Sequence, residues 1–157
     1  MSGISISVGT LADLDAVIEV MEDSFDQAYG EAWTAAQCAG LLPVPGVWLS
    51  LARASDRLLG FALARIVADE AELLLLAVRP ADQRRGVGTR LLNAFCTEAA
   101  RRGAVRVHLE VRDGNQAVKL YERSGFARVG RRRDYYRGPV SVRHDALTLA
   151  KKMSPAA

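Results

Sequence analysis

A basic, glycine-containing stretch from Gln83 to Thr89 carries the residue types that bind a phosphate group. It reads Gln-Arg-Arg-Gly-Val-Gly-Thr, follows an apolar run at Leu73–Val78 and precedes a helical pattern at Arg90–Arg102. The first backbone N–H groups of a helix have no partner within the helix, and the helix dipole adds partial positive charge there. The two glycines let a pyrophosphate approach the backbone, and the two arginines add formal charge. The sequence therefore predicts an anion site at the start of this helix.

The spacing of the glycines limits which phosphate ligand this loop resembles. A P-loop would end in Gly-Lys-Ser/Thr, a triplet that the chain lacks, and a dinucleotide fingerprint would need a third glycine where Leu91 stands. What remains is the pattern Gln/Arg-x-x-Gly-x-Gly. Taken alone, a glycine-rich turn with surface arginines is an equally good interpretation.

A carboxylate and a phenol further along the chain could exchange protons with a substrate. Glu110 stands late in a predicted strand, Val105–Val111, on the face that also carries His108, which makes it a candidate general base. The pattern alone favours the alternative, a solvated polar face on an edge strand, because acidic residues are mostly surface residues. Tyr121 falls in a predicted helix at 116–124, where a core tyrosine with its hydroxyl at a polar edge is the commoner case.

Hydrophobic periodicity and turn residues predict the elements that must position these groups. Strands are expected at 4–8, 47–54, 58–67, 73–78, 105–111, 126–136 and 142–153. The first helix is expected to start at Leu11, with Thr10 as its cap and Asp13 completing a capping box. The second is expected at 34–42, the third after the glycine loop, and the fourth after Asn115 as its cap. This order predicts a mixed α/β sheet, mostly antiparallel, of about seven strands with four helices. One helix crosses over after the fourth strand.

Two segments carry more specific expectations. The run Leu73–Val78 shows no alternation, which is typical of a central strand buried on both faces. The segment Phe25–Gly46 holds Phe25, Tyr29 and Trp33, and Gly30 breaks the chain within it. It is interpreted as a loop and helix beside an acceptor site, although these aromatic residues could equally fill the edge of the core. A single domain is expected at residues 1–153, with a disordered tail at 154–157.

Composition bounds the class of protein. The chain has 157 residues, half of them apolar, and a net charge of +3, which is typical of one soluble domain and gives no argument for nucleic-acid binding. Cys38 and Cys96 form no motif, which fits a reducing cytosol. The N-terminus lacks the features of a signal peptide, and the longest apolar run is too short to span a membrane. A cytoplasmic protein without a metal site is expected, as a monomer or weak dimer.

The loop and a second motif together resemble a known superfamily. Gln83-Arg84-Arg85-Gly86-Val87-Gly88 looks like the acetyl-CoA pyrophosphate loop of the GCN5-related N-acetyltransferases (GNAT). Residues 115–126, with Leu-Tyr-Glu-Arg-Ser-Gly-Phe at their end, resemble the Asn…Leu-Tyr-Glu-x-x-Gly-Phe signature of the same superfamily. The predicted order of elements is similar to the acetyltransferase fold, which is splayed at its central strands, over nearly the whole chain.

Within the superfamily, the chain is most similar to the bacterial ribosomal-protein-alanine N-acetyltransferases. Three pieces carry this narrower resemblance, namely Leu-Glu-Val-Arg at 109–112, Arg-Arg-Arg-Asp-Tyr-Tyr at 131–136 and His-Asp-Ala at 144–146. The resemblance implies Glu110 as general base and Tyr121 as general acid. It places the contacts with acetyl-CoA, the cosubstrate, on Leu76, Ala77 and Val78, on Gln83, Arg84, Arg85, Gly86, Val87, Gly88 and Thr89, and on Asn115.

One departure concerns the turn before the second motif. The family interval between its Asn and its Tyr is one residue longer than Asn115 to Tyr121, and counting back from Tyr121 reaches Gly114. The cofactor role of Asn115 is therefore less secure than the role of Tyr121, whose following motif is intact.

The resemblance also implies a mechanism of direct transfer to an amine. The reference pKa of an α-amine is about 7.7–8.0, against about 10.4 for lysine, so a useful fraction is already neutral at pH 7. Glu110 would take up one proton, the N–H of Val78 would polarise the thioester carbonyl, and Tyr121 would protonate the leaving thiolate.

Three functions remain open from the sequence. The first is acetylation of a protein N-terminus, with the N-terminal alanine of a small-subunit ribosomal protein as the acceptor. The second is acetylation of a small amine such as an amino acid, polyamine or antibiotic, and the third is a non-catalytic acyl-CoA sensor. The arginines at 128–137 are best explained as the solvated face of an edge strand. Attraction to an acidic partner or a ribosomal surface is the second interpretation, and RNA binding is the third.

Overall fold

The computed structural model describes residues 3–25, 31–137 and 143–153. Gly30, Tyr29, the link at 138–142 and the expected tail at 154–157 lie outside the described residues. The strands are β1 Ser5–Val8, β2 Val47–Ala54, β3 Arg57–Val67, β4 Glu70–Val78, β5 Arg106–Arg112, β6 Ala127–Arg137 and β7 Arg143–Lys152. The helices are α1 Leu14–Ser24, α2 Ala35–Leu41, α3 Val87–Arg101 and α4 Ala117–Arg123, with short 3-10 turns η1 Leu11–Asp13 and η3 Pro80–Asp82.

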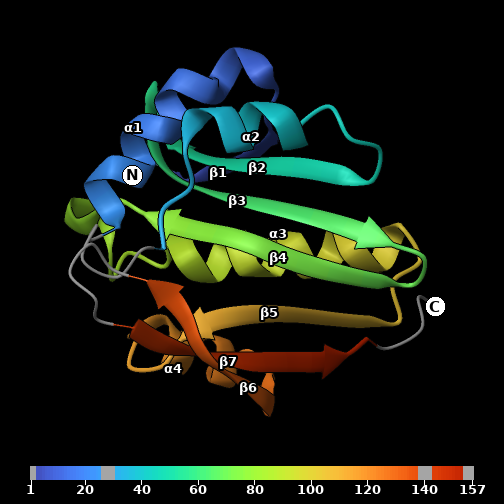
Figure 1. Ribbon diagram of the computed structural model, residues 1–157. Helices are drawn as coiled ribbons and strands as arrows, with labels where there is room; N and C mark the ends of the chain where they lie inside the picture. The colour runs from blue at the N-terminus through green and yellow to red at the C-terminus, as the bar shows by residue number, and fades with distance from the viewer. Residues whose placement is uncertain (1–2, 26–30, 138–142, 154–157) are drawn as a thin grey trace.

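The seven strands form one sheet in the order β1-β2-β3-β4-β5-β7-β6 (Figure 1). Every neighbouring pair is antiparallel except β4 and β5, which run parallel. Parallel neighbours need a crossover connection, and α3 supplies it. The predicted mixed sheet with a helical crossover after the fourth strand is therefore confirmed.

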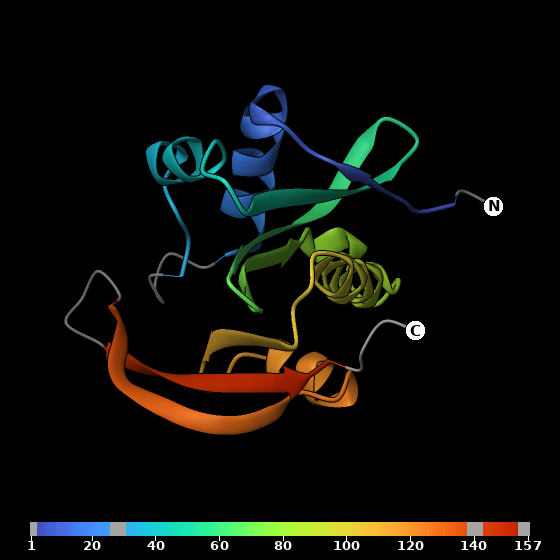
Figure 2. The same cartoon turned by 90° about the vertical axis from the view of Figure 1, so that its right-hand side faces the viewer.

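Helices cover both faces of the sheet and divide the core in two. The α1 and α2 helices pack with Leu49, Phe61 and Leu75 on one face. The α3 and α4 helices pack on the other face, where α3 buries an apolar stripe of Val87, Leu91, Leu92, Phe95 and Ala99 (Figures 1 and 2). A helix with such a stripe forms because one face can leave water while the polar face stays solvated. No helix within the described ranges is long and apolar enough to cross a membrane.

A bulge in β4 changes which residues of that strand face which core. The pairing with β3 shifts between Leu73 and Leu75, which leaves Leu74 as the extra residue. Leu73 packs on the α3 side, whereas Leu75 and Ala77 pack on the α1 side. Leu74, Leu76 and Val78 are only half-buried, so the predicted burial of this run on both faces is wrong. The run is continuously apolar because its other positions border a cavity.

The parallel pairing of β4 with β5 is short, and the strands separate beyond it. Pairing covers Glu70–Leu73 against Arg106–Leu109 and then stops. The ends of β4 and β5 therefore diverge, as the resemblance implied, and Figure 2 shows β5, β6 and β7 as a group set apart from the rest of the sheet.

Two valines at strand ends stay exposed. Val8, at the end of β1, is 80% exposed, and Val105, just before β5, is 55% exposed. The predicted capping box of Thr10 and Asp13 is present, although it opens the 3-10 turn η1 rather than α1 directly.

The C-terminal end of α3 carries an ion-pair cluster with a testable pH dependence. Glu98 accepts hydrogen bonds from Arg101 and Arg102, and Arg102 also lies over the Trp48 ring at 4.4 Å. The hydrogen bond from Arg101 is the main cause that lowers the pKa of Glu98 to about 2, against an ordinary value of 4.5. A lowered carboxyl pKa stabilises the fold above the ordinary pKa, and this contribution disappears as pH falls toward the folded-state pKa.

Replacing Glu98 by Gln is expected to lower the free energy of unfolding at pH 7 by about 0.5–1 kcal/mol, because solvent screens most of this pair. That corresponds to a fall in Tm of about 1–4 °C. The Tm values of the native protein and of Glu98→Gln, measured by thermal melts, should become equal as pH falls from 4.5 to about 2, where the native Glu98 carboxylate becomes protonated. Glu122→Gln, which removes a wider and more exposed pair with Arg128 at 3.6 Å, is the control and should change Tm less.

Candidate active site

A cavity of about 850 Å³ opens where β4 and β5 diverge. Residues 72–78 of β4 form one wall and residues 109–112 of β5 form the opposite wall. The start of α3 and helix α4 close one end, and Tyr135 and Tyr136 of β6 border the other side, with Phe25, Glu31 and Trp33. The cavity is therefore built from segments that are far apart in the sequence.

The predicted anion site lies at the start of α3 within this cavity. Gly86 is in the left-handed region, with φ of +80°, and no side chain caps the helix. Arg84 also has a positive φ, +67°, which is uncommon for a residue with a Cβ. Both line the cavity with Gln83, Val87, Gly88 and Thr89. Uncapped N–H groups, positive charge and the two glycines, which leave the backbone open, match what a pyrophosphate needs.

Gly88 lets α3 approach α4. A Cβ at this position would lie 3.1 Å from Leu120 Cδ2, which is closer than side chains normally come. Because α4 also carries Tyr121, this close approach fixes the distance between the loop and the predicted acid.

Arg85 is engaged differently from the other residues of the loop. Its Nη1 donates to Asp82 Oδ1 at 2.8 Å, and Arg57 Nη1 donates to Asp82 Oδ2 at 2.6 Å. Asp82 is only 2% exposed, so these two arginines satisfy a buried carboxylate. Arg85 is not among the residues that line the cavity. Its guanidinium anchors the loop, and a direct contact with the cofactor stays a prediction.

Glu110 lies on an interior strand rather than an edge strand. Because β5 is flanked by β4 and β7, the alternative of a solvated edge strand is wrong. The Glu110 side chain is 18% exposed and lines the cavity. Its Oε1 accepts from Arg132 Nη1 at 2.9 Å, whereas Oε2 is buried and has no hydrogen-bond partner within the described part of the chain. An unpartnered buried carboxylate oxygen is costly, which points to a partner supplied by substrate or water.

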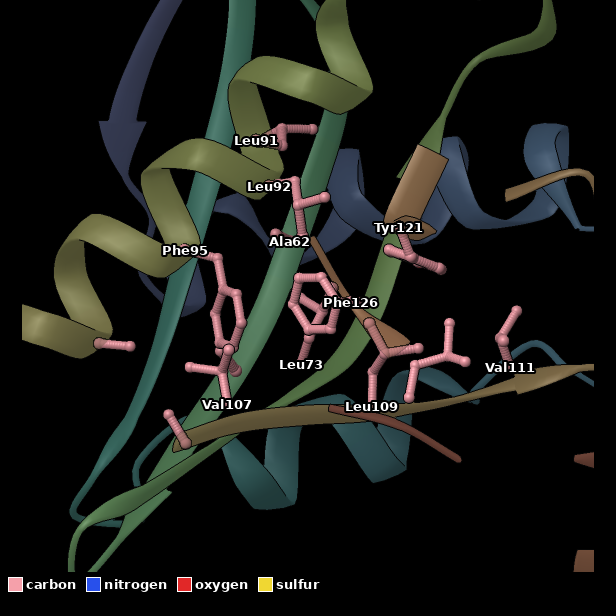
Figure 3. Close-up of a cluster of buried hydrophobic side chains, with 14 of the residues drawn as sticks. Ala62, Leu73, Leu91, Leu92, Phe95, Val107, Leu109, Val111, Tyr121 and Phe126 are labelled. Atoms are coloured by element: carbon pink, nitrogen blue, oxygen red, sulfur yellow. The ribbon is translucent and has the colours of Figure 1, made fainter. Parts of the chain in front are cut away.

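Tyr121 is a core residue that also lines the cavity. It is 6% exposed and its ring meets Phe126 edge-on at a centroid distance of 6.1 Å (Figure 3). It belongs to the same buried cluster as Leu109 and Val111 of β5, the strand that carries Glu110 (Figure 3). Burial, and secondarily the nearby Glu31 carboxylate, raises the pKa of Tyr121 well above its usual value. The phenol therefore stays protonated throughout the physiological range.

Glu31 also lines the cavity, although no local motif marks it as a site residue. Its Oε1 accepts from Arg112 Nε at 2.9 Å and its Oε2 accepts from Asn115 Nδ2 at 2.9 Å. Both side chains of the Glu31–Arg112 ion pair are mostly buried, with exposed fractions of 10% for Glu31 and 13% for Arg112. One carboxylate thus ties the segment before α2 to the end of β5 and to the turn before α4.

Asn115 is used inside the protein. Its Oδ1 accepts from the N–H of Ala117, the first residue of α4, and its amide nitrogen donates to Glu31. The N-cap residue of α4 is Gln116 rather than the predicted Asn115. Asn115 and Gly114 both line the cavity, and Gly114 has φ of +91°. A cofactor contact by Asn115 stays a prediction, because both ends of its side chain already have partners.

Tyr136 approaches Glu110 from β6 through an irregularity in the hairpin. The pairing of β6 with β7 shifts between Arg132 and Tyr136, and Asp134 there has φ of +54°. Asp145 closes this bulge by accepting from the Asp134 N–H at 3.0 Å and from Arg131 at 2.7 Å. The Tyr136 hydroxyl donates to the backbone carbonyl of Glu110 at 3.3 Å. Tyr136 and Arg132, which flank this bulge, both contact Glu110 of β5.

The arginines of β6 are largely paired within the protein. Arg128 pairs with Glu122, Arg131 with Asp113 and Asp145, and Arg132 with Glu110. This pairing supports a solvated face over a nucleic-acid surface. Among the described residues, no three His, Cys, Asp or Glu side chains are grouped as a metal would require.

Comparison with known proteins agrees with this geometry. A family model described as the acetyltransferase (GNAT) family matches residues 14–126. The [ribosomal protein bS18]-alanine N-acetyltransferase of Salmonella typhimurium is 44% identical over 103 residues, which span 64% of this chain and 68% of the relative. N-alpha-acetyltransferase RimI of Mycobacterium tuberculosis is 46% identical over 91 residues, spanning 55% and 56% of the two chains.

A solved structure extends the similarity to nearly the whole chain. The crystal structure of the ribosomal-protein-S18-alanine N-acetyltransferase from Escherichia coli superposes with a TM-score of 0.88 at 31% identity. It covers 99% of this chain, and this chain covers 97% of it. The matched family region contains the loop at the start of α3, Glu110 and Tyr121. The chain therefore belongs to the acetyltransferase (GNAT) family.

Proposed function

We propose that this protein transfers the acetyl group of acetyl-CoA to the N-terminal α-amine of a protein, and that the acceptor is the N-terminal alanine of a small-subunit ribosomal protein. In this reaction acetyl-CoA supplies the acyl group, and its thiol is the leaving group. The observation that carries the proposal is the cavity, because Glu110 with its unpartnered carboxylate oxygen, Tyr121 and the start of α3, where the anion site is predicted, all line it. The names of the relatives support the choice of acceptor.

The chain's own residues divide the work between binding and proton transfer. The start of α3 would bind the pyrophosphate through Gln83, Arg84 and the backbone of Gly86–Thr89. Leu76, Ala77 and Val78 line the neighbouring wall, where the Val78 N–H would polarise the thioester carbonyl. This arrangement holds the acyl carbon between the anion site and Glu110.

Proton transfer then needs one base and one acid. The acceptor nitrogen bonds to the acyl carbon, the carbon–sulfur bond breaks, and Glu110 Oε2 takes the amine proton directly or through water. Tyr121 gives its proton to the departing sulfur. The raised pKa of Tyr121 makes this donation uphill, so a positioned hydrogen bond must assist it.

The border of the cavity favours an extended acceptor over a small closed pocket. Tyr135 is 45% exposed and its ring meets Tyr136 edge-on at 5.0 Å, which leaves an aromatic surface at the opening. Phe25 and Trp33 line the same cavity. An aromatic border of this kind suits a peptide backbone that enters with its N-terminus directed at Glu110.

A panel of acceptors tests the proposal. Purified protein and acetyl-CoA would be offered short peptides that differ in their first residues, together with spermidine, lysine and an aminoglycoside, and thiol release would be recorded. We expect turnover on peptides with a free N-terminal alanine and none after that amine is blocked. Turnover confined to the small amines would transfer the assignment to small-molecule acetylation. Binding of acetyl-CoA with no turnover on any acceptor would favour the sensor function.

A further inference from the structure

The two oxygens of Glu110 have different surroundings, and one side chain from another strand causes the difference. Arg132 of β6 donates to Oε1 at 2.9 Å, whereas Oε2 is buried and unpartnered among the residues that the structure describes. The Arg132 side chain is 57% exposed while that of Glu110 is 18% exposed. The guanidinium therefore reaches into the cavity wall from the solvent side.

Arg132 is held in place although it is exposed. Its guanidinium lies over the Tyr135 ring, 4.3 Å from the ring centroid, which is a favourable cation–π distance. The bulge closed by Asp145 begins immediately after Arg132 and fixes the direction of the strand. The hydrogen bond with Glu110 raises the pKa of Arg132, so the guanidinium is charged at any pH of interest.

We propose that Arg132 is a positioning residue for acetyl transfer, which holds Oε1 of Glu110 so that Oε2 is the oxygen presented to the acceptor amine. This inference rests on the proposed role of Glu110 as base. A carboxylate fixed at one oxygen cannot rotate freely, so its other oxygen is aimed along one direction. Proton transfer in this arrangement needs a hydrogen bond at one oxygen only, and Arg132 satisfies the other.

The fixed positive charge has a second consequence for the pH range of activity. A nearby cation favours the deprotonated form of a bound amine, which is the form needed for attack. Removing it therefore moves the ascending limb of the pH–rate profile to higher pH. The other charged or titratable groups around Glu110 are His108 and Arg112 on β5, Glu72 on β4, Tyr136 on β6, Glu31 before α2 and Tyr121 on α4.

Replacing Arg132 by Gln tests the proposal against a matched control. In Arg132→Gln the ascending limb of kcat against pH is expected to move up by about 0.5–1 unit, with kcat at pH 7 falling about 3–10-fold. Arg132→Lys keeps the charge and should restore the limb. Arg133→Gln removes an equal charge from the next residue, which none of the described ion pairs joins to Glu110, and should leave the limb where it is. If the ascending limb lay at the same pH in Arg132→Gln and Arg133→Gln, the proposal would be overturned.

A spectrum of the free protein separates this inference from the proposed function. With glutamate side chains labelled by carbon-13, the chemical shift of the Glu110 carboxyl signal at pH 7 should change in Arg132→Gln and not in Arg133→Gln, because only Arg132 donates to Oε1. Glu110→Gln identifies the signal. This measurement needs no acceptor, so it still decides the role of Arg132 if the peptide panel fails. An unchanged chemical shift in Arg132→Gln would show that the guanidinium does not hold Glu110 in solution.

Discussion

Glu110→Gln is expected to lower kcat for transfer to an N-terminal alanine peptide by about 10²–10⁴-fold, the usual contribution of a positioned general base. The amide keeps the size of the side chain and can still accept from Arg132 at the Oε1 position. It cannot take up a proton at the position of Oε2, where the structure leaves the carboxylate oxygen unpartnered. The loss should therefore appear in the chemical step, and the Kd for acetyl-CoA, measured by calorimetry, should stay unchanged.

Glu72→Gln is the matched control for this substitution. Glu72 lines the same cavity, but it accepts from Arg65 at 3.0 Å and is paired on the neighbouring strand. Its neutral variant should retain most of the turnover. If Glu110→Gln turned over at the wild-type rate, the base would have to be another group or water alone, and the inference about Arg132 would then concern only the shape of the cavity.

The parts of the site that local sequence could predict are those built by local interactions. The loop from Gln83 to Thr89 follows a strand and starts a helix, so its uncapped N–H groups follow from chain order alone. The short helix with Tyr121 is likewise bounded by Asn115 and by Gly125, whose φ is +95°. Glycines with positive φ and capping side chains leave signals within a few residues.

Other features depend on partners that are far apart in the sequence. The pairing of Glu31 with Arg112 joins residues separated by 81 positions, and that with Asn115 spans 84. Glu31 in isolation is an acidic residue before a helix, with nothing to mark it as buried. The pair of Arg132 and Glu110 is similar, because it depends on a hairpin bulge that the pattern of β6 does not reveal.

The environment of Glu110 also depends on strands that are distant in the sequence. The alternation of β5 predicts one polar face correctly, but it does not tell where the strand lies in the sheet. The strand is interior because β7 pairs with β5 and β6 takes the edge. The bulge at Leu74 has the same character, since an uninterrupted run of leucines hides the point at which the strand changes faces.

Tyr121→Phe is expected to lower kcat by about 10²-fold, the lower end for loss of a general acid, with little effect on folding. The ring is buried against Phe126, and phenylalanine keeps that contact, so the free energy of unfolding should change by less than about 1.5 kcal/mol. Because burial raises the pKa of Tyr121, the wild-type profile should show no loss of rate from its ionisation up to about pH 10. Tyr135→Phe, at the exposed rim of the same cavity, is the control and should retain activity.

The choice of leaving group separates an acid from a residue that only shapes the cavity. A thiol with a lower pKa departs without needing a proton, so a donor thioester with an acidic thiol should lose much less rate in Tyr121→Phe than acetyl-CoA does. A packing defect would slow both donors equally, because it would displace the acyl carbon from Glu110 whatever the leaving group. Equal losses with the two donors would therefore remove Tyr121 from proton transfer and leave it as a wall of the cavity.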